Sequence, residues 1–163
     1  MNDTHTISMM VANKPGVLVR VALVFARRGY NIDSLVVSPS VNQKYSRMTI
    51  TAKGDLATLD QIIKNVNKLV DVLHASEHDY AHAIDRELAL VKIKSTPAAR
   101  LAVNKHSKKY HVKVISTDAA TLIIAQTGTT DELNQFEELV KKYGIIEMVR
   151  TGKVLMAKGR EQT

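Results

Sequence analysis

The sequence predicts an α+β protein made of two tandem units, each with the element order βαββαβ. Two observations carry this prediction. Segments predicted as strands alternate apolar and polar residues with period two, and the segments between them place apolar residues at helical spacing. The second half of the 163-residue chain then repeats the order of the first half. Units of about 75 residues are near the lower end of the sizes at which a single core is stable.

The first half is expected to contain four strands and two helices. Ile7, Met9 and Val11 share one face of the first strand, and Gly29 stands just beyond the first helix, where glycine commonly ends helices. Asp55 is expected to cap the second helix. The elements are expected, in order, at residues 6–11, 18–28, 31–38, 45–52, 55–69 and 70–75.

The second half repeats this order. Thr96 and Pro97 make a favourable start for its first helix, residues 129–132 form a capping box for its second helix, and Gly144 ends that helix. Strands are expected at residues 87–94, 112–116, 121–126 and 145–149, with a short edge strand at 154–157. Both halves are therefore predicted to be ferredoxin-like, each an antiparallel four-stranded sheet with two helices on one face.

These patterns predict an N-terminal domain at residues 1–77, a linker at 78–86 and a C-terminal domain at 87–163. The linker is expected where the chain is polar and shows no period. A small domain with a bare sheet edge tends to be completed by pairing with another chain. The sequence therefore predicts that the protein forms an oligomer.

The turn over residues 13–18, between the first strand and the first helix, is the segment most informative about function. It leaves backbone N–H groups free at a helix N-terminus, and Gly16 allows a ligand to approach them closely. Such a place suits a carboxylate or a phosphate. The turn therefore predicts a pocket for a small anion or an amino acid.

Two side-chain amides, those of Asn13 and Asn31, favour the amino-acid interpretation. Taken alone, Asn13 is more simply a helix cap, and Gly16 a residue that eases a tight turn. The first helix is expected to return the chain to the same end of the sheet and so bring Asn31 near Gly16. Amides that converge on free N–H groups can bind both the carboxylate and the ammonium of an amino acid. The expected binding residues are Asn13, Gly16, Val17, Leu18, Asn31 and Ile32.

A net charge of +7 raises nucleic acid as a partner. However, the strand at 45–52 carries Tyr45 as its only aromatic residue, and the aromatic signature of an RNA-recognition domain is missing. The basic cluster between Lys105 and Lys113 is more simply a solvated helix end. No nucleic-acid partner is expected.

The sequence shows no pattern typical of a catalytic or metal site. The chain has no cysteine, which excludes disulfides, thiolate metal sites and cysteine nucleophiles. His74, His78 and His82 are four residues apart, but they fall in a predicted strand and linker, where solvated histidines are commoner than ligands. No triad, phosphate loop or paired carboxylates are present. The polar N-terminus and the lack of a long apolar run predict a cytoplasmic protein with no membrane partner.

Six segments of the chain carry motifs of a known family. They are residues 13–18, 25–32, 46–50, 61–72, 86–92 and 150–152. In these segments the chain resembles the acetolactate (acetohydroxyacid) synthase small subunits, whose N-terminal part is an ACT domain. The resemblance covers nearly the whole chain and is most specific in the first half. It implies that the first unit is an ACT domain and that the chain is a regulatory subunit, with no catalytic activity of its own.

This resemblance implies a subunit that activates a separate catalytic subunit, which is thiamine-diphosphate-dependent and converts two molecules of pyruvate into 2-acetolactate and CO2. Valine or another branched-chain amino acid would be the feedback effector. No cofactor is expected on this chain, because thiamine diphosphate, Mg and FAD would be held by the catalytic subunit. ACT domains would pair as a homodimer through the strand at 31–38, so that Asn31 and Ile32 come from the paired chain. The alternative is a free-standing ACT-type amino-acid sensor that acts on a different enzyme.

Overall fold

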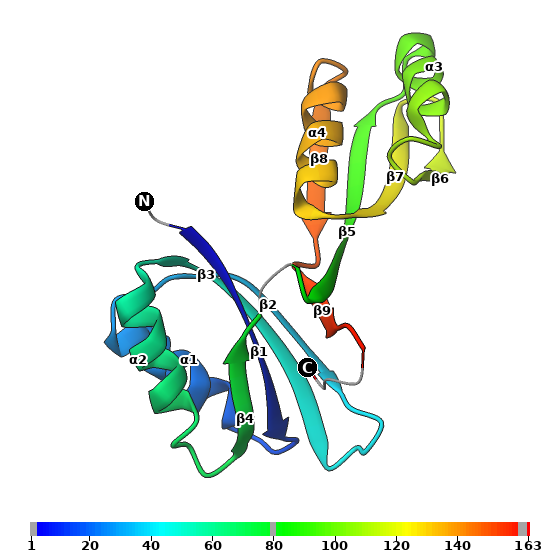
Figure 1. Ribbon diagram of the computed structural model, residues 1–163. Helices are drawn as coiled ribbons and strands as arrows, with labels where there is room; N and C mark the ends of the chain where they lie inside the picture. Colours follow the sequence, from blue (N-terminus) through cyan, green and yellow to red (C-terminus); the bar gives the residue numbers. More distant parts are fainter. Residues whose placement is uncertain (1–2, 79–80, 160–162) are drawn as a thin grey trace. The chain divides into compact units, whose positions relative to one another are not determined.

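Figure 1 shows the fold in a computed structural model, which describes residues 3–78, 81–159 and 163. By its internal contacts the chain divides into two compact units. The first unit comprises Met1–Asp85 together with Gly152–Thr163, and the second comprises Arg86–Thr151. The α+β class and the repeated βαββαβ order are confirmed.

The first unit is an antiparallel sheet with two helices. Its elements are β1 (Asp3–Ala12), α1 (Val17–Arg27), β2 (Ile32–Pro39), β3 (Tyr45–Gly54), α2 (Leu56–Val66) and β4 (Val72–Glu77). The strands lie in the order β2-β3-β1-β4, and the helices cover one face of the sheet (Figure 1). Asp55 caps α2 as expected, and the hydrogen bond that its carboxylate accepts from the Thr58 N–H lowers the pKa of Asp55. Strand β4 begins two residues later than expected, after a turn held by Asn67, whose side chain binds the backbone of Ala75.

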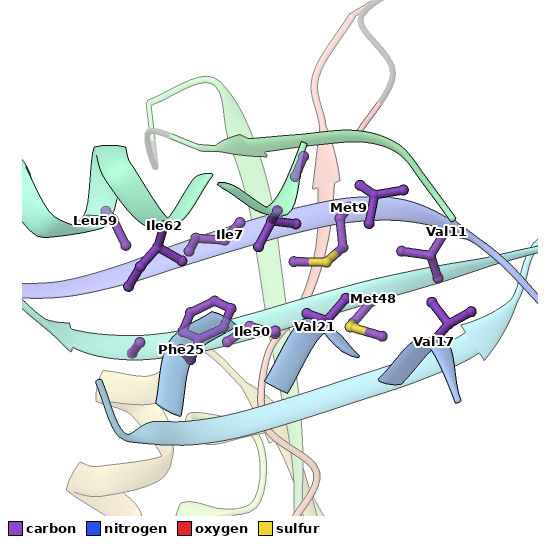
Figure 2. Packing of buried hydrophobic residues seen from close by; sticks show 14 residues of the cluster. Ile7, Met9, Val11, Val17, Val21, Phe25, Met48, Ile50, Leu59 and Ile62 are labelled. Carbon is purple, nitrogen blue, oxygen red and sulfur yellow. The ribbon is translucent and has the colours of Figure 1, made fainter. Parts of the chain in front are cut away.

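The core of the first unit lies between the sheet and the two helices (Figure 2). Ile7, Met9 and Val11 point into it from β1, as the period-two alternation predicts. Strands β3 and β4 and the two helices contribute the rest of the apolar contact, with Phe25 of α1 fully buried. The other labelled residues of this core are Val17, Val21, Met48, Ile50, Leu59 and Ile62.

The opposite face of this sheet is polar, and yet it is buried. The register of β1 and β3 places Thr6 beside Thr51 and Ser8 beside Thr49, on the face that points away from the helices. All four side chains are buried. Hydroxyl-bearing residues in this position are typical of a sheet face that meets water, whereas here the His78 ring contacts the Ser8 hydroxyl.

The C-terminal segment, Gly152–Thr163, belongs to this first unit. Its strand β9 (Val154–Ala157) pairs with β5 (Ala83–Lys94), and Arg47 of β3 donates a hydrogen bond to the Thr163 carbonyl. The contacts therefore group this segment with the first unit, whereas the expected C-terminal domain of residues 87–163 included it. The start of β5, residues 83–85, belongs to this first unit as well. The expected domain boundaries stay a prediction.

The second unit repeats the architecture of the first. Besides β5 from Arg86 onward it contains α3 (Pro97–His106), β6 (Val112–Thr117), β7 (Thr121–Gly128), α4 (Thr130–Lys141) and β8 (Ile145–Arg150), with the strand order β6-β7-β5-β8. Thr96 and the capping box of Thr129 and Glu132 start the two helices as predicted. The Thr129 N–H, which donates to the Glu132 carboxylate, lowers the pKa of Glu132. Residues 83–86 were expected as linker but are strand.

Candidate functional site

The turn between β1 and α1 has the geometry that the sequence predicts. Gly16 is the N-cap residue of α1 and has a φ of 83°, in the left-handed region that favours glycine. No side chain caps this helix. Among the described residues, the N–H groups of Gly16 and Leu18 meet no acceptor, and the Val17 N–H reaches the Lys14 carbonyl only at 3.5 Å. The turn therefore offers donors to a ligand.

Asn13 holds the turn in place from its far side. Its Nδ2 donates to the Gln43 carbonyl at 2.9 Å, and its backbone N–H donates to the Lys44 carbonyl at 2.8 Å. The interpretation of Asn13 as a helix cap is therefore wrong, because Gly16 occupies the N-cap position. The Asn13 side chain joins the turn to the loop between β2 and β3, and its second N–H remains as a donor.

Arg20 adds a positive charge beside this turn, which the sequence analysis missed. A Cβ atom placed on Gly16 would lie 3.4 Å from Nη1 of Arg20. The guanidinium is held by an ion pair with Asp71, and the Asp71 carbonyl accepts the Ala12 N–H at 2.7 Å. The helix dipole disfavours a cation in the first turn of a helix. Arg20 at this position was therefore a signal, visible in the sequence, that the residue has a specific partner or ligand. Its position next to the free N–H groups favours an anionic ligand.

Asn31 and Ile32 do not meet Gly16 within one chain. The register pairs Ile32 with Ala52 and Ala52 with His5, near the start of β1, whereas the Gly16 turn follows the end of β1. The expectation that the first helix returns the chain to the same end of the sheet is therefore wrong. Helix α1 runs antiparallel to β1 and carries the chain back along the whole strand. Asn31 instead donates to the Asp33 carboxylate at 3.4 Å.

The three histidines at four-residue spacing do not form a cluster. His74 lies exposed on β4, the His78 ring contacts Ser8 Oγ at 2.5 Å and Ser76 Oγ at 3.2 Å, and the His82 carbonyl accepts the Lys158 N–H. Within the part of the chain that the structure describes, no group of three His, Asp or Glu residues is arranged to hold a metal ion. The helices described here are all too short or too polar to cross a bilayer.

Comparison with known proteins identifies the family. The family model of the AHAS small subunit-like ACT domain matches residues 7–74, and the model for the small subunit of acetolactate synthase matches residues 86–159. A probable acetolactate synthase small subunit from Archaeoglobus fulgidus is 39% identical over 97% of this chain and 99% of its own length. The acetolactate synthase small subunit of Mycobacterium bovis is 37% identical, over 96% of this chain and 93% of its own.

The chain belongs to the acetolactate synthase small-subunit family. The resemblance noted in the sequence is thereby confirmed, and the first unit is an ACT domain. A crystal structure of an acetolactate synthase small subunit from Thermotoga maritima matches the fold with a TM-score of 0.87. That protein is 34% identical, and the match covers 98% of this chain and 99% of the other.

The left-handed conformation of Gly16 can be tested directly. Gly16→Ala should lower the free energy of unfolding of the first unit by about 1–2 kcal/mol, because a Cβ is disfavoured at this φ. Gly16→Asn should cost less, since asparagine tolerates the left-handed region. Urea unfolding followed by circular dichroism measures both. Equal stability of Gly16→Ala and the wild type would contradict the geometry of this turn.

Proposed function

We propose that this chain is the regulatory small subunit of an acetolactate synthase, which activates a separate catalytic subunit and carries its feedback control by valine or another branched-chain amino acid. The similarity to acetolactate synthase small subunits over nearly the full length of the chain is the observation that carries the proposal. Acetolactate formation, with its thiamine diphosphate, Mg and FAD, belongs to the catalytic subunit. This chain supplies binding and regulation in the cytoplasm.

The effector site is completed by two chains that pair through β2. This strand is the edge of its sheet, so its outer side is available to a second copy. Antiparallel pairing about a two-fold axis reverses the partner strand. The start of the partner's β2, with the partner's Asn31, then lies at the sheet end that carries Gly16. This arrangement brings together residues that are far apart within one chain.

The surface of α1 supports the same pairing. Arg20 points toward Asp71, on the side of β4. Leu18 is about 200° around the helix from Arg20 and therefore faces the β2 side. Its side chain is 43% exposed. An exposed leucine beside a bare strand edge is typical of a surface that pairs with another copy.

Each group of the site has a role in binding a zwitterion. The N–H groups of Gly16, Val17 and Leu18 hold the effector carboxylate, aided by the Asn13 amide and by the nearby charge of Arg20. The partner's Asn31 and the backbone of the partner's Ile32 bind the ammonium and close the site. The apolar side chain of the effector rests on the neighbouring aliphatic residues.

The activating role is tested by mixing purified subunits. The chain alone should form no acetolactate, and its addition should raise the rate of its cognate catalytic subunit. Acetolactate formation by this chain, free of any catalytic subunit, would contradict the assignment. An unchanged rate on mixing would favour the alternative, a free-standing ACT-type sensor of another enzyme.

The effector site is tested with Asn13→Ala and Asn31→Ala. Each amide makes a hydrogen bond to a charged group, worth about 1.5–3 kcal/mol, so each variant should bind valine about ten- to hundredfold more weakly. Calorimetric titration with valine, leucine and isoleucine measures the affinity and ranks the effectors. Activation of the catalytic subunit should survive in both variants. Unchanged affinity in both would rule this site out.

The pairing is tested with a matched pair of substitutions on α1. Leu18→Glu should shift the protein toward monomers, because it places a charge against the partner copy. Leu23→Glu is the control, since Leu23 is similarly exposed, at 45%, but lies on the Arg20 side of the helix. Sedimentation at micromolar concentration, with and without valine, measures both. A monomeric wild type under both conditions, or equal behaviour of the two variants, would refute pairing through this edge.

A further inference from the structure

Gly152 is the residue at which the chain passes from the second unit to the first. The residue before it, Thr151, belongs to the second unit, where its N–H donates to the Leu88 carbonyl at 3.0 Å. Its hydroxyl also accepts the Leu88 N–H at 3.1 Å. Gly152 itself belongs to the first unit and is buried. One peptide bond therefore joins a residue fixed on β5 to a residue fixed on the ACT domain.

Gly152 packs its backbone directly against β2. A Cβ atom at this position would lie 2.7 Å from the Ser34 Cβ and 2.8 Å from the Ser34 Oγ. Its φ of 83° is also in the left-handed region. Both the contact and the backbone conformation therefore require glycine here.

Ser34 follows the irregular part of β2 that orients Asn31. The register with β3 shifts between Ile32 and Ser34, which leaves Asp33 as the irregular residue. Asp33 accepts the hydrogen bond of Asn31 and lies 3.7 Å from the ammonium of Lys53. Ser34 and Asn31 thus lie on either side of one short bulge, so a displacement of Ser34 moves Asn31 as well.

Gly152 is held in place on its other side. The next residue, Lys153, forms an ion pair with Asp85 at 3.7 Å, and both side chains are largely buried. Further along, the Lys158 N–H donates to the His82 carbonyl at 2.9 Å. A side chain added at residue 152 would therefore strain both this segment and the facing part of β2, which the ladder with β3 holds in place.

We infer that Gly152 is a positioning residue for effector binding. By its contact with Ser34 it sets the position of the bulge in β2, and thereby of Asn31 and Ile32. This inference rests on the proposed function, since it requires that Asn31 and Ile32 bind the effector.

The test compares two glycines of the C-terminal segment in the full-length protein. Gly152→Ala should weaken valine binding about ten- to hundredfold, the loss expected when one hydrogen bond to a charged group is misplaced. Gly159→Ala is the matched control. Gly159 also has a left-handed φ, of 74°, but a Cβ there would meet no atom within 4 Å. Its affinity for valine should equal that of the wild type.

A double-mutant cycle isolates the contact from backbone strain. In the S34G background, which removes the atoms that the new methyl group would meet, Gly152→Ala should change the affinity within only about twofold. Ser34→Val enlarges the same contact from the β2 side and should weaken binding even if Gly152→Ala does not fold.

Calorimetry with valine, leucine and isoleucine gives the readout, with circular dichroism as the check on folding. Equal affinities of Gly152→Ala and Gly159→Ala, or of Ser34→Val and the wild type, would overturn the inference while the effector site stands. A wild-type chain that binds none of the three amino acids would overturn the effector site and this inference together. Loss of affinity that S34G restores would support it.

Discussion

The first unit depends on β1 being buried on both faces. It lies between β3 and β4, so both of its edges are paired. One face packs Ile7, Met9 and Val11 against the helices, and the other buries the hydroxyls of Thr6 and Ser8. The hydrophobic effect is strong on the first face and weak on the second, where hydrogen bonds and packing must suffice. On this second face the His78 ring contacts Ser8 of β1, and the backbone of Gly152 packs against Ser34 of β2.

Local signals allowed most of the fold to be predicted from the sequence. Each of these signals depends only on residues close together in the sequence. Examples are the alternation in β1, the helix caps at Asp55, Thr96 and Thr129, and the short edge strand at 154–157. The position of the C-terminal segment in the first unit was not predictable in this way. It depends on contacts between residues more than a hundred positions apart, such as that of Arg47 with Thr163.

The sequence predicted those features of the candidate site that depend on neighbouring residues. It did not predict those that depend on contacts between distant residues. Gly16 and the free N–H groups follow from a strand, a glycine and a helix in succession. The placement of Asn31 failed because a helix antiparallel to β1 returns the chain to the other end of the sheet. Arg20 carried a local signal, as a cation in the first turn of a helix, but its ion pair with Asp71, 51 residues away, was not predictable from that signal. The periodicity of a sequence shows which residues of an element lie on the same face. It does not show which end of the sheet a residue reaches.

The geometry of the sheet explains why an effector site here would be regulatory. Within one chain, the N–H donors at Gly16 and the amide of Asn31 lie at opposite ends of the sheet, so one chain holds only half of the proposed site. The proposed two-fold pairing through β2 would create two complete sites and would make occupancy depend on the interface. A ligand that binds only the paired state stabilises that state by mass action. The ligand then shifts the equilibrium between the paired and unpaired states by the difference between its affinities for the two. Such a difference is the physical requirement for feedback control.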